Sequence, residues 1–224
     1  DYFPSLERQL PDEVFPAASD PKAPAVGKGI STGHFDFAPT VTSDAAMGDG
    51  QVVNWVVQQI MGESTGPRFF SAGLYRPHLP WYVPQKYFDL HPVDEIELPP
   101  YQANDLADVP PAFAKLVGAE PDLDTKTMAW VKSHGDTKWR EAIQGYLASV
   151  SFADAMVGKL LEALDASGRA DKTIIMLWAD HGFHLGQKDL WGKMTLWDET
   201  TNVPFIVVAP GVTTPGSRSD EAVS

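Results

Sequence analysis

A short apolar run that ends in polar and small residues constrains this chain more than any other stretch. Residues 173–179 (Thr-Ile-Ile-Met-Leu-Trp-Ala) follow a polar turn and are typical of a buried β-strand. Asp180, His181 and Gly182 come where that strand must end. Ligands of open α/β sheets bind beyond the carboxyl ends of strands, so these side chains stand where a substrate can reach them. Lys193 follows in a Gly-containing loop and can fold back over the same edge.

Two interpretations of this segment follow from local chemistry. A carboxylate, an imidazole and an ammonium group at one strand end suit a metal ion together with an anionic group. The same Asp-His-Gly triplet is also typical of a simple turn, in which Asp180 accepts backbone N–H bonds and Gly182 takes a positive φ. One Asp and one His do not by themselves make a metal site, so both interpretations stay open.

A second polar segment follows a second predicted strand. Residues 68–75 are apolar at several positions and predict a strand that ends in Arg76-Pro77-His78. Pro77 fixes its own φ and biases Arg76 toward an extended conformation, so His78 is presented by a stiff loop. A single His in a Pro-rich loop is also typical of ordinary protein surface.

The remaining pattern predicts the fold class. Residues 48–50 (Gly-Asp-Gly) open a helix with a broad apolar face that Gly62 ends. Apolar residues recur at three- and four-residue steps from Trp139 to Leu164, and Ser167-Gly168 closes this second helix. A third apolar run covers residues 205–209. Three strands separated by helices predict an α/β fold with a largely parallel sheet flanked by helices.

Two regions are predicted to be irregular. Residues 1–41 show no sustained periodicity, and residues 80–135 form a Pro-rich insertion with short helical turns at 85–90 and 112–116. Aromatic side chains in the insertion either pack locally or line a substrate pocket: Trp81, Tyr82, Tyr87, Phe88 and Tyr101.

Composition excludes several classes of function. The chain has 17 basic and 30 acidic residues and a formal net charge of -13, which argues against nucleic acid or an anionic membrane surface as a partner. It has no Cys, so thiolate chemistry and disulfides are excluded and the redox compartment cannot be read. No apolar run is long enough for a membrane-spanning helix.

Two blocks of residues carry a family resemblance. The first includes Asp180-His181-Gly182, Leu185-Gly186, Leu190-Trp191-Gly192-Lys193, Val203-Pro204-Phe205-Ile206 and Ala209-Pro210-Gly211. The second includes Phe69-Phe70, Arg76-Pro77-His78-Leu79-Pro80-Trp81, Val83-Pro84 and Tyr87-Phe88. In this order the blocks resemble the sulfatase family of the alkaline-phosphatase-like superfamily, especially iduronate-2-sulfatase and its bacterial relatives. The resemblance covers the chain from about residue 35 onward.

The resemblance implies a mechanism and roles for four residues. A sulfatase attacks the sulfur of a sulfate ester with a hydrated formylglycine, and a divalent cation, usually Ca²⁺, holds the nucleophile and the sulfate oxygens. Asp180 and His181 would be the metal ligands of this chain, although a ring nitrogen is a poor ligand for a hard cation. Lys193 and His78 would be catalytic and bind the sulfate, with His78 as general acid, and His181 would also contact the substrate.

Other parts of the family pattern are missing. The formylglycine motif, Cys/Ser-x-Pro/Ala-x-Arg, is absent, and residues 64–68 (Ser-Thr-Gly-Pro-Arg) are a near match that we interpret as a turn between helix and strand. Residues 187–189 (Gln-Lys-Asp) replace a Glu-His-Gly that is common in the loop facing the substrate. The chain begins without Met and ends just past a turn. We therefore expect residues 1–224 to be the middle-to-late portion of a sulfatase catalytic domain, with the rest of that domain as a partner.

The predicted function is hydrolysis of a sulfate ester, with a sulfated sugar as the expected substrate, in a periplasmic, secreted or lysosomal setting as is usual in the family. One alternative is a phosphomonoester or phosphonate hydrolase of the same superfamily. The other is a non-catalytic domain of this fold that binds an anion or a sugar.

Overall fold

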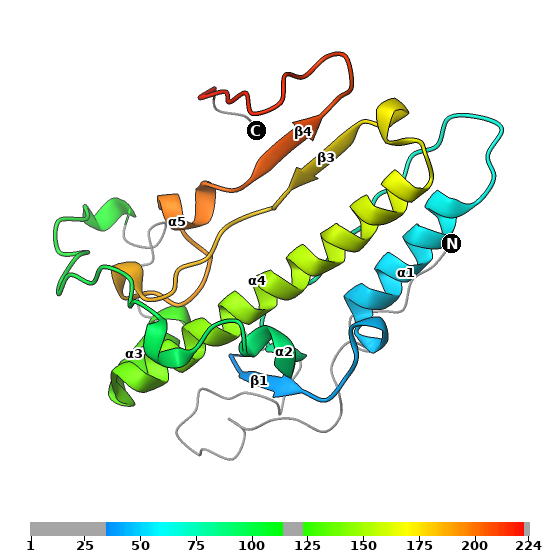
Figure 1. The fold of residues 1–224 in the computed structure, drawn as a ribbon. Helices are drawn as coiled ribbons and strands as arrows, with labels where there is room; N and C mark the ends of the chain where they lie inside the picture. The colour runs from blue at the N-terminus through cyan, green and yellow to red at the C-terminus, as the bar shows by residue number, and fades with distance from the viewer. Residues whose placement is uncertain (1–34, 114–122, 222–224) are drawn as a thin grey trace.

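A single long helix organises the protein. The computed structural model describes residues 35–113 and 123–221. Helix α4 (Gly135–Ala166) runs through the middle of the molecule, and α1 (Gly48–Met61) packs along it (Figure 1). Of the apolar positions predicted for α4, Trp139, Ile143 and Leu164 are buried, whereas Val150 and Leu161 are exposed. The spacing missed two residues of the covered face, Phe152 and Met156. Both predicted helices are confirmed, including the ends at Gly62 and at Ser167-Gly168.

Two groups of apolar side chains form the core on α4. One is rich in aromatic residues and gathers around Phe35, Trp81, Trp130 and Trp191. The other joins α1 to α4 through Val53, Val83, Tyr87, Phe88, Phe152 and Met156. Four of the five aromatic residues of the insertion are packed in the core, as Trp81, Tyr82, Tyr87 and Phe88 are buried, whereas Tyr101 is exposed.

A small parallel sheet lies against α4. Strand β1 (Phe37–Thr40) pairs in parallel with β2 (Trp81–Pro84), and Phe37 is opposite Trp81. The short helix α2 (Gln85–Phe88) follows β2 directly. Gly145 of α4 faces this sheet, and a Cβ at that position would be 2.6 Å from Cβ of Phe37. The absence of a side chain there lets the helix approach the strand.

A second pair of strands flanks the segment that contains Asp180, His181 and Lys193. Strand β3 (Ile175–Trp178) pairs with β4 (Phe205–Val208) in antiparallel register, with Ile175 opposite Val208. The segment between them contains the one-turn helix α5 (Asp198–Thr201) and reverses the chain direction. Helix α3 (Leu123–Ser133) precedes α4 and contacts it.

The α/β class is confirmed, and several local predictions need correction. Residues 68–75 form no strand: they have no neighbouring strand within the described residues, and the side chain of Phe69 is 89% exposed. Strands β3 and β4 are antiparallel, whereas β1 and β2 supply the parallel pairing. Inside regions predicted to be irregular, the structure forms β1, β2 and α3.

The turn predictions had a mixed outcome. The helical turn predicted at 85–90 is confirmed by α2. That at 112–116 is a 3₁₀ turn over Pro111–Phe113, and the residues from 114 to 116 lie outside the described residues. Most of the predicted irregular segment 1–41 also lies outside them. The Ser64 hydroxyl donates to the Gly66 carbonyl at 2.8 Å, as expected of a turn after α1.

Two glycines of α4 test the close packing of this helix. Gly145→Ala should lower the free energy of unfolding by about 1–2 kcal/mol, because overpacking of about 1–3 kcal/mol exceeds the gain in helix propensity. Gly158→Ala is the matched control, since a Cβ there would meet no atom within 4 Å. That variant should gain up to about 1 kcal/mol. Equal stabilities of the two variants in urea denaturation would contradict the packing.

Candidate active site

The loop after β3 is fixed to α4 by one indole ring. Trp139 Nε1–H donates a hydrogen bond to the carbonyl of Leu185 at 2.8 Å. Gly186 lies against the same ring with φ of +123°, and a Cβ at that position would overlap the ring. Only glycine satisfies both the backbone conformation and the packing. The loop therefore has a defined position relative to the core of the protein.

The start of the loop is fixed to α5. The N–H of Gly182 donates to the carbonyl of Thr200 at 2.8 Å. A Cβ on Gly182 would overlap the carbonyl of Glu199. Gly182 is thus required for close backbone packing and has no positive φ, so this part of the simple-turn interpretation is wrong. The other part is confirmed, because Asp180 Oδ1 accepts the N–H of His181 at 3.1 Å.

Asp180 and His181 lie side by side at the end of β3. Nδ1 of His181 lies 2.8 Å from the carbonyl oxygen of Gly182. Because a carbonyl only accepts, Nδ1 carries the proton of the neutral ring and donates this hydrogen bond. Its Nε2 faces Oδ2 of Asp180 at 3.5 Å, and the Asp180 side chain is 85% exposed. A lone pair on each of these atoms fits a shared cation. Within residues 35–113 and 123–221, no three His, Asp or Glu side chains gather closely enough to hold a metal ion.

The loop that carries His78 is fixed by the beginning of α1. The carboxylate of Asp49 accepts the N–H groups of Tyr75 at 2.8 Å and of Arg76 at 3.0 Å. The buried guanidinium of Arg76 then donates to the carbonyls of Tyr82 at 3.2 Å and of His78 at 3.3 Å. These bonds hold the backbone on both sides of Pro77, so His78 stands on a rigid turn.

The imidazole of His78 has a defined orientation. Its Nδ1 lies 2.6 Å from the carbonyl of Leu79, and its ring stacks on Tyr75 with centroids 4.6 Å apart. Nδ1–H is therefore the donor to Leu79, and Nε2 is the nitrogen presented to a ligand. His78 and His181 thus have the same tautomer, each set by a backbone carbonyl.

The two loops meet at one site. The pKa of His78 is lowered, first by partial removal of the ring from water, against the hydrogen bond to the Leu79 carbonyl, which raises it. Electrostatic interactions with Lys193, Arg76 and His181 lower it further. These groups come from distant parts of the sequence and lie close enough to act on one another. Lys193 and His181 thus lie within electrostatic range of His78, and Asp180 is next to His181.

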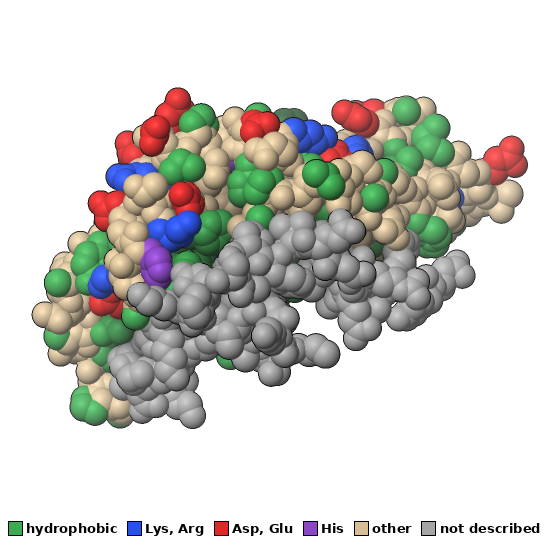
Figure 2. Space-filling view, turned by 90° about the horizontal axis from the view of Figure 1, so that it is seen from below, with side chains coloured by type: hydrophobic (Ala, Val, Ile, Leu, Met, Phe, Trp, Pro, Cys, Tyr) green, Lys and Arg blue, Asp and Glu red, His purple; other side chains and the backbone are tan. Residues whose placement is uncertain are grey.

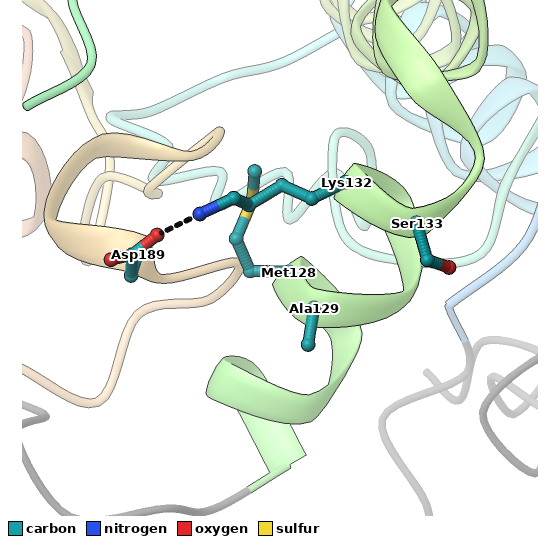
Figure 3. A pocket seen from close by; sticks show the side chains of 5 residues that line it. All are labelled: Met128, Ala129, Lys132, Ser133 and Asp189. Carbon is teal, nitrogen blue, oxygen red and sulfur yellow. Dashed lines mark hydrogen bonds and ion pairs between the residues drawn. The ribbon is translucent and has the colours of Figure 1, made fainter. Parts of the chain in front are cut away.

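The turn at residues 187–189 is fixed by ion pairs. Lys188 Nζ lies 2.9 Å from Oδ2 of Asp105, and Asp189 Oδ1 lies 2.8 Å from Nζ of Lys132. Lys188 and Asp189 both have a positive φ, which costs free energy in residues with a side chain. In Figure 3, Lys132 reaches from α3 to Asp189 across a cavity of about 540 Å³. The residues Gln187-Lys188-Asp189, which differ from the family pattern, are therefore stabilised by ion pairs to Asp105 and Lys132.

Sequence analysis missed the residues that hold the site in place. Asp49 was identified only as part of a helix start, and Trp139 only as an apolar helix position. His184 was not singled out, although its side chain is fully buried in the loop. Asp49 and Trp139 bind backbone groups far away in sequence, and His184 binds the hydroxyl of Thr195 across the loop. No local sequence pattern reports such contacts.

Comparison with known proteins identifies the family. The sequence matches the protein-family model described as Sulfatase over residues 17–224. The chain belongs to the sulfatase family. A sulfatase from Formosa agariphila is 41% identical over 177 residues, which are 79% of this chain and 34% of that protein. Iduronate 2-sulfatase from Homo sapiens is 31% identical over 175 residues, which are 76% of this chain and 32% of that protein.

The solved structures with a similar fold agree with this assignment. Phosphonate monoester hydrolase SpPMH from Silicibacter pomeroyi superposes with a TM-score of 0.64 at 22% identity, over 78% of this chain and 35% of that one. This likeness shows that the chain has part of the alkaline-phosphatase-like α/β fold. The sulfatase chain spans about a third of the length of the curated relatives that it matches. Members of the family use a divalent metal and formylglycine.

Burial of His184 should make the protein sensitive to acid. Burial lowers the pKa of His184, and the carboxylate of Glu199 opposes this only in part. The unfolded chain therefore takes up this proton at higher pH than the folded chain. The free energy of unfolding should fall as the pH drops below about 6.5, with a slope of at most about 1.4 kcal/mol per pH unit from this group.

His184→Gln tests this assignment. Its stability should depend less on pH than that of the wild type between about pH 6.5 and 4.5, when both are unfolded with urea at each pH. His78 contributes equally to the pH dependence of stability in the wild type and in His184→Gln, so it does not affect the comparison. Identical slopes would contradict a neutral, buried His184.

Proposed function

We propose that this chain supplies the side of a sulfatase active site that binds the sulfate group and protonates the leaving oxygen, in the hydrolysis of a sulfate ester of a sugar. The observation that supports this proposal is the meeting of His78, His181 and Lys193 at the end of β3, beside Asp180. Three nitrogen-bearing side chains gather there in a chain of net charge -13. An anion is the ligand that such a site attracts.

Lys193 and His78 have different roles towards the sulfate ester. The ammonium of Lys193 is a compact point charge that pairs with sulfate oxygens and stabilises the charge that develops on them. His78 presents Nε2, the nitrogen that would protonate the leaving oxygen. The lowered pKa of His78 keeps its ring neutral in the free site. A bound anion favours the charged imidazolium, so substrate binding itself supplies the acid.

Asp180 and His181 fit the metal of the family. Asp180 Oδ2 and His181 Nε2 would hold a divalent cation, and Ca²⁺ suits the exposed carboxylate. When bound, such a cation neutralises charge on the sulfate oxygens and on the nucleophile. Further oxygen ligands and the formylglycine would come from the rest of a sulfatase domain, since Ser64 lies in an exposed turn.

The rest of that domain is also the partner that fits the β3–β4 ribbon. Within the described residues each of these strands has only one neighbour. Two-stranded ribbons are marginal in water, and this one exposes Ile174, Met176, Trp178, Phe205, Ile206 and Val208. Further strands and helices would cover these side chains, and residues 1–224 would then be the middle-to-late portion of the domain.

Other classes of partner fit less well. On the face drawn in Figure 2, acidic side chains lie among basic ones with no block of positive charge that would suit nucleic acid. No helix in the described residues has the length and apolar character needed to cross a bilayer. A sulfated small molecule or saccharide remains the expected substrate, with residues 187–189 next to it.

Substitutions in a protein that carries this chain within a whole sulfatase domain test the proposed roles. Lys193→Ala and His78→Ala should each lower kcat/KM for a sulfate ester by about 10²–10³-fold, because each removes a contact made to the transition state. Lys86→Ala is the control, since Lys86 pairs with Asp44 on the surface. An unchanged kcat/KM in Lys193→Ala would contradict the proposal.

The same protein distinguishes the alternatives. A sulfatase should turn over an aryl sulfate much faster than the matching phosphate monoester or phosphonate ester. The reverse preference would favour the phosphonate hydrolases that share the fold. Binding of sulfated sugars without any turnover would favour a non-catalytic domain.

The chain of 224 residues should show neither turnover nor tight metal binding by itself. Ca²⁺ takes about 6–8 oxygen ligands, and Asp180 offers one carboxylate. Calorimetric titration of Ca²⁺ into the wild type and into Asp180→Asn should give the same weak isotherm. A tight isotherm that Asp180→Asn abolishes, or measurable hydrolysis of an aryl sulfate, would show that the site is complete without further ligands.

A further inference from the structure

His184 is a buried polar residue that the proposed mechanism does not use. Its side chain has no exposed surface, and it lies in the loop between His181 and Lys193. The backbone N–H of His184 donates to the carbonyl of Gly192 at 2.7 Å. Its ring Nε2 lies 2.9 Å from the hydroxyl of Thr195. One residue therefore contacts the chain immediately before Lys193 and two residues after it.

The ring of His184 belongs to a network of hydroxyl groups. The hydroxyl oxygens of Thr195 and Thr200 lie 3.1 Å apart, and the Thr200 hydroxyl also donates to the carbonyl of Trp197 at 2.9 Å. His184 Nε2 joins this network through the Thr195 hydroxyl. Its Nδ1 lies 4.0 Å from Oε2 of Glu199 on α5. His184 therefore connects the loop before Lys193 with Thr195 and α5 after it.

Lys193 has little else to define its position. Its side chain has four rotatable bonds, so the place of its ammonium group depends on how firmly the backbone beneath it is held. The N–H of Thr195 donates to the carbonyl of Lys193 at 2.9 Å. His184 holds Thr195 by its hydroxyl and Gly192 by its carbonyl. The turn that carries Lys193 is therefore closed on both sides by the same residue.

We propose that His184 is a positioning residue for Lys193, which fixes the turn Gly192–Thr195 so that the ammonium group of Lys193 reaches the sulfate. This inference rests on the proposed function of Lys193. His184 touches neither substrate nor metal in this account. Its effect on catalysis should therefore disappear when Lys193 is removed, whereas its effect on stability should not.

The test is a double-mutant cycle in a protein that carries this chain within a whole sulfatase domain. His184→Leu should lower kcat/KM for an aryl sulfate by about tenfold or more, since misplacing a catalytic group by about 1 Å costs up to about 10²-fold. His184→Gln should stay within about threefold of the wild type, because its amide can still donate to Thr195. In a Lys193→Ala background, His184→Leu should change kcat/KM by less than about twofold.

Two control variants separate positioning from a general loss of stability. Thr195→Val removes the hydroxyl that His184 binds and keeps the shape of the side chain, so it should reproduce most of the loss seen in His184→Leu. His91→Leu removes another hydrogen-bonded imidazole, one that contacts Ser151 on α4, and should leave kcat/KM unchanged. Equal losses from His184→Leu with and without Lys193, or equal losses in His184→Leu and His184→Gln, would overturn the proposal.

A measurement on the chain itself keeps this inference distinct from the proposed function. Amide hydrogen exchange of Thr195 should accelerate by about tenfold or more in His184→Leu and stay unchanged in His91→Leu. If the wild-type protein hydrolyses no sulfate ester, the proposed function fails and exchange alone decides the positioning. Unchanged exchange of Thr195 in His184→Leu would overturn the positioning role whatever the activity.

Discussion

The contact between Trp139 and residues 185–186 is the constraint on which the site depends. The indole lies on the long helix α4, donates to the Leu185 carbonyl and packs where Gly186 has no side chain. Helix α4 also carries the parallel sheet and α1, whose first turn holds the backbone before His78 through Asp49. The loop of His78 and the loop from His181 to Lys193, about a hundred residues apart in sequence, are therefore both held in place by the packing around α4. Their polar side chains lie within electrostatic range of His78.

Much of the fold could be predicted from the sequence because the helices have a strong local signal. The apolar steps from Trp139 to Leu164 and the glycines after each helix were sufficient to place α1 and α4. Strand pairing was harder, since it depends on a partner. Residues 68–75 look like a strand but have no neighbouring strand in the described residues. Strand β2 lies among prolines, which hide its strand pattern, and all four of its residues pair with β1. The direction of pairing between β3 and β4 is set by the turn around α5, which carries no periodic signal.

The candidate site was predictable in its residue types and not in its support. Asp180 and His181 follow the strand β3, whereas the strand expected before His78 does not form. The resemblance to sulfatases points to all four residues, and Lys193 and His181 act electrostatically on His78. The sequence does not reveal Asp49 or His184 as supports, because Asp49 binds the backbone of another segment and His184 binds the Thr195 hydroxyl across the loop. Gly182 was noticed for the wrong reason: it allows close packing on α5 and has no positive φ.

The central claim is that His78 and Lys193 meet at one anion site, and NMR titration of the His78 imidazole tests it most directly. The positive charge of Lys193 contributes to the lowered pKa of His78, so Lys193→Gln should raise the pKa of His78. Lys86→Gln, which removes a surface lysine paired with Asp44, should leave that pKa where the wild type has it. If Lys193→Gln and the wild type gave the same His78 titration curve, the two loops would not form one site and the account would be wrong.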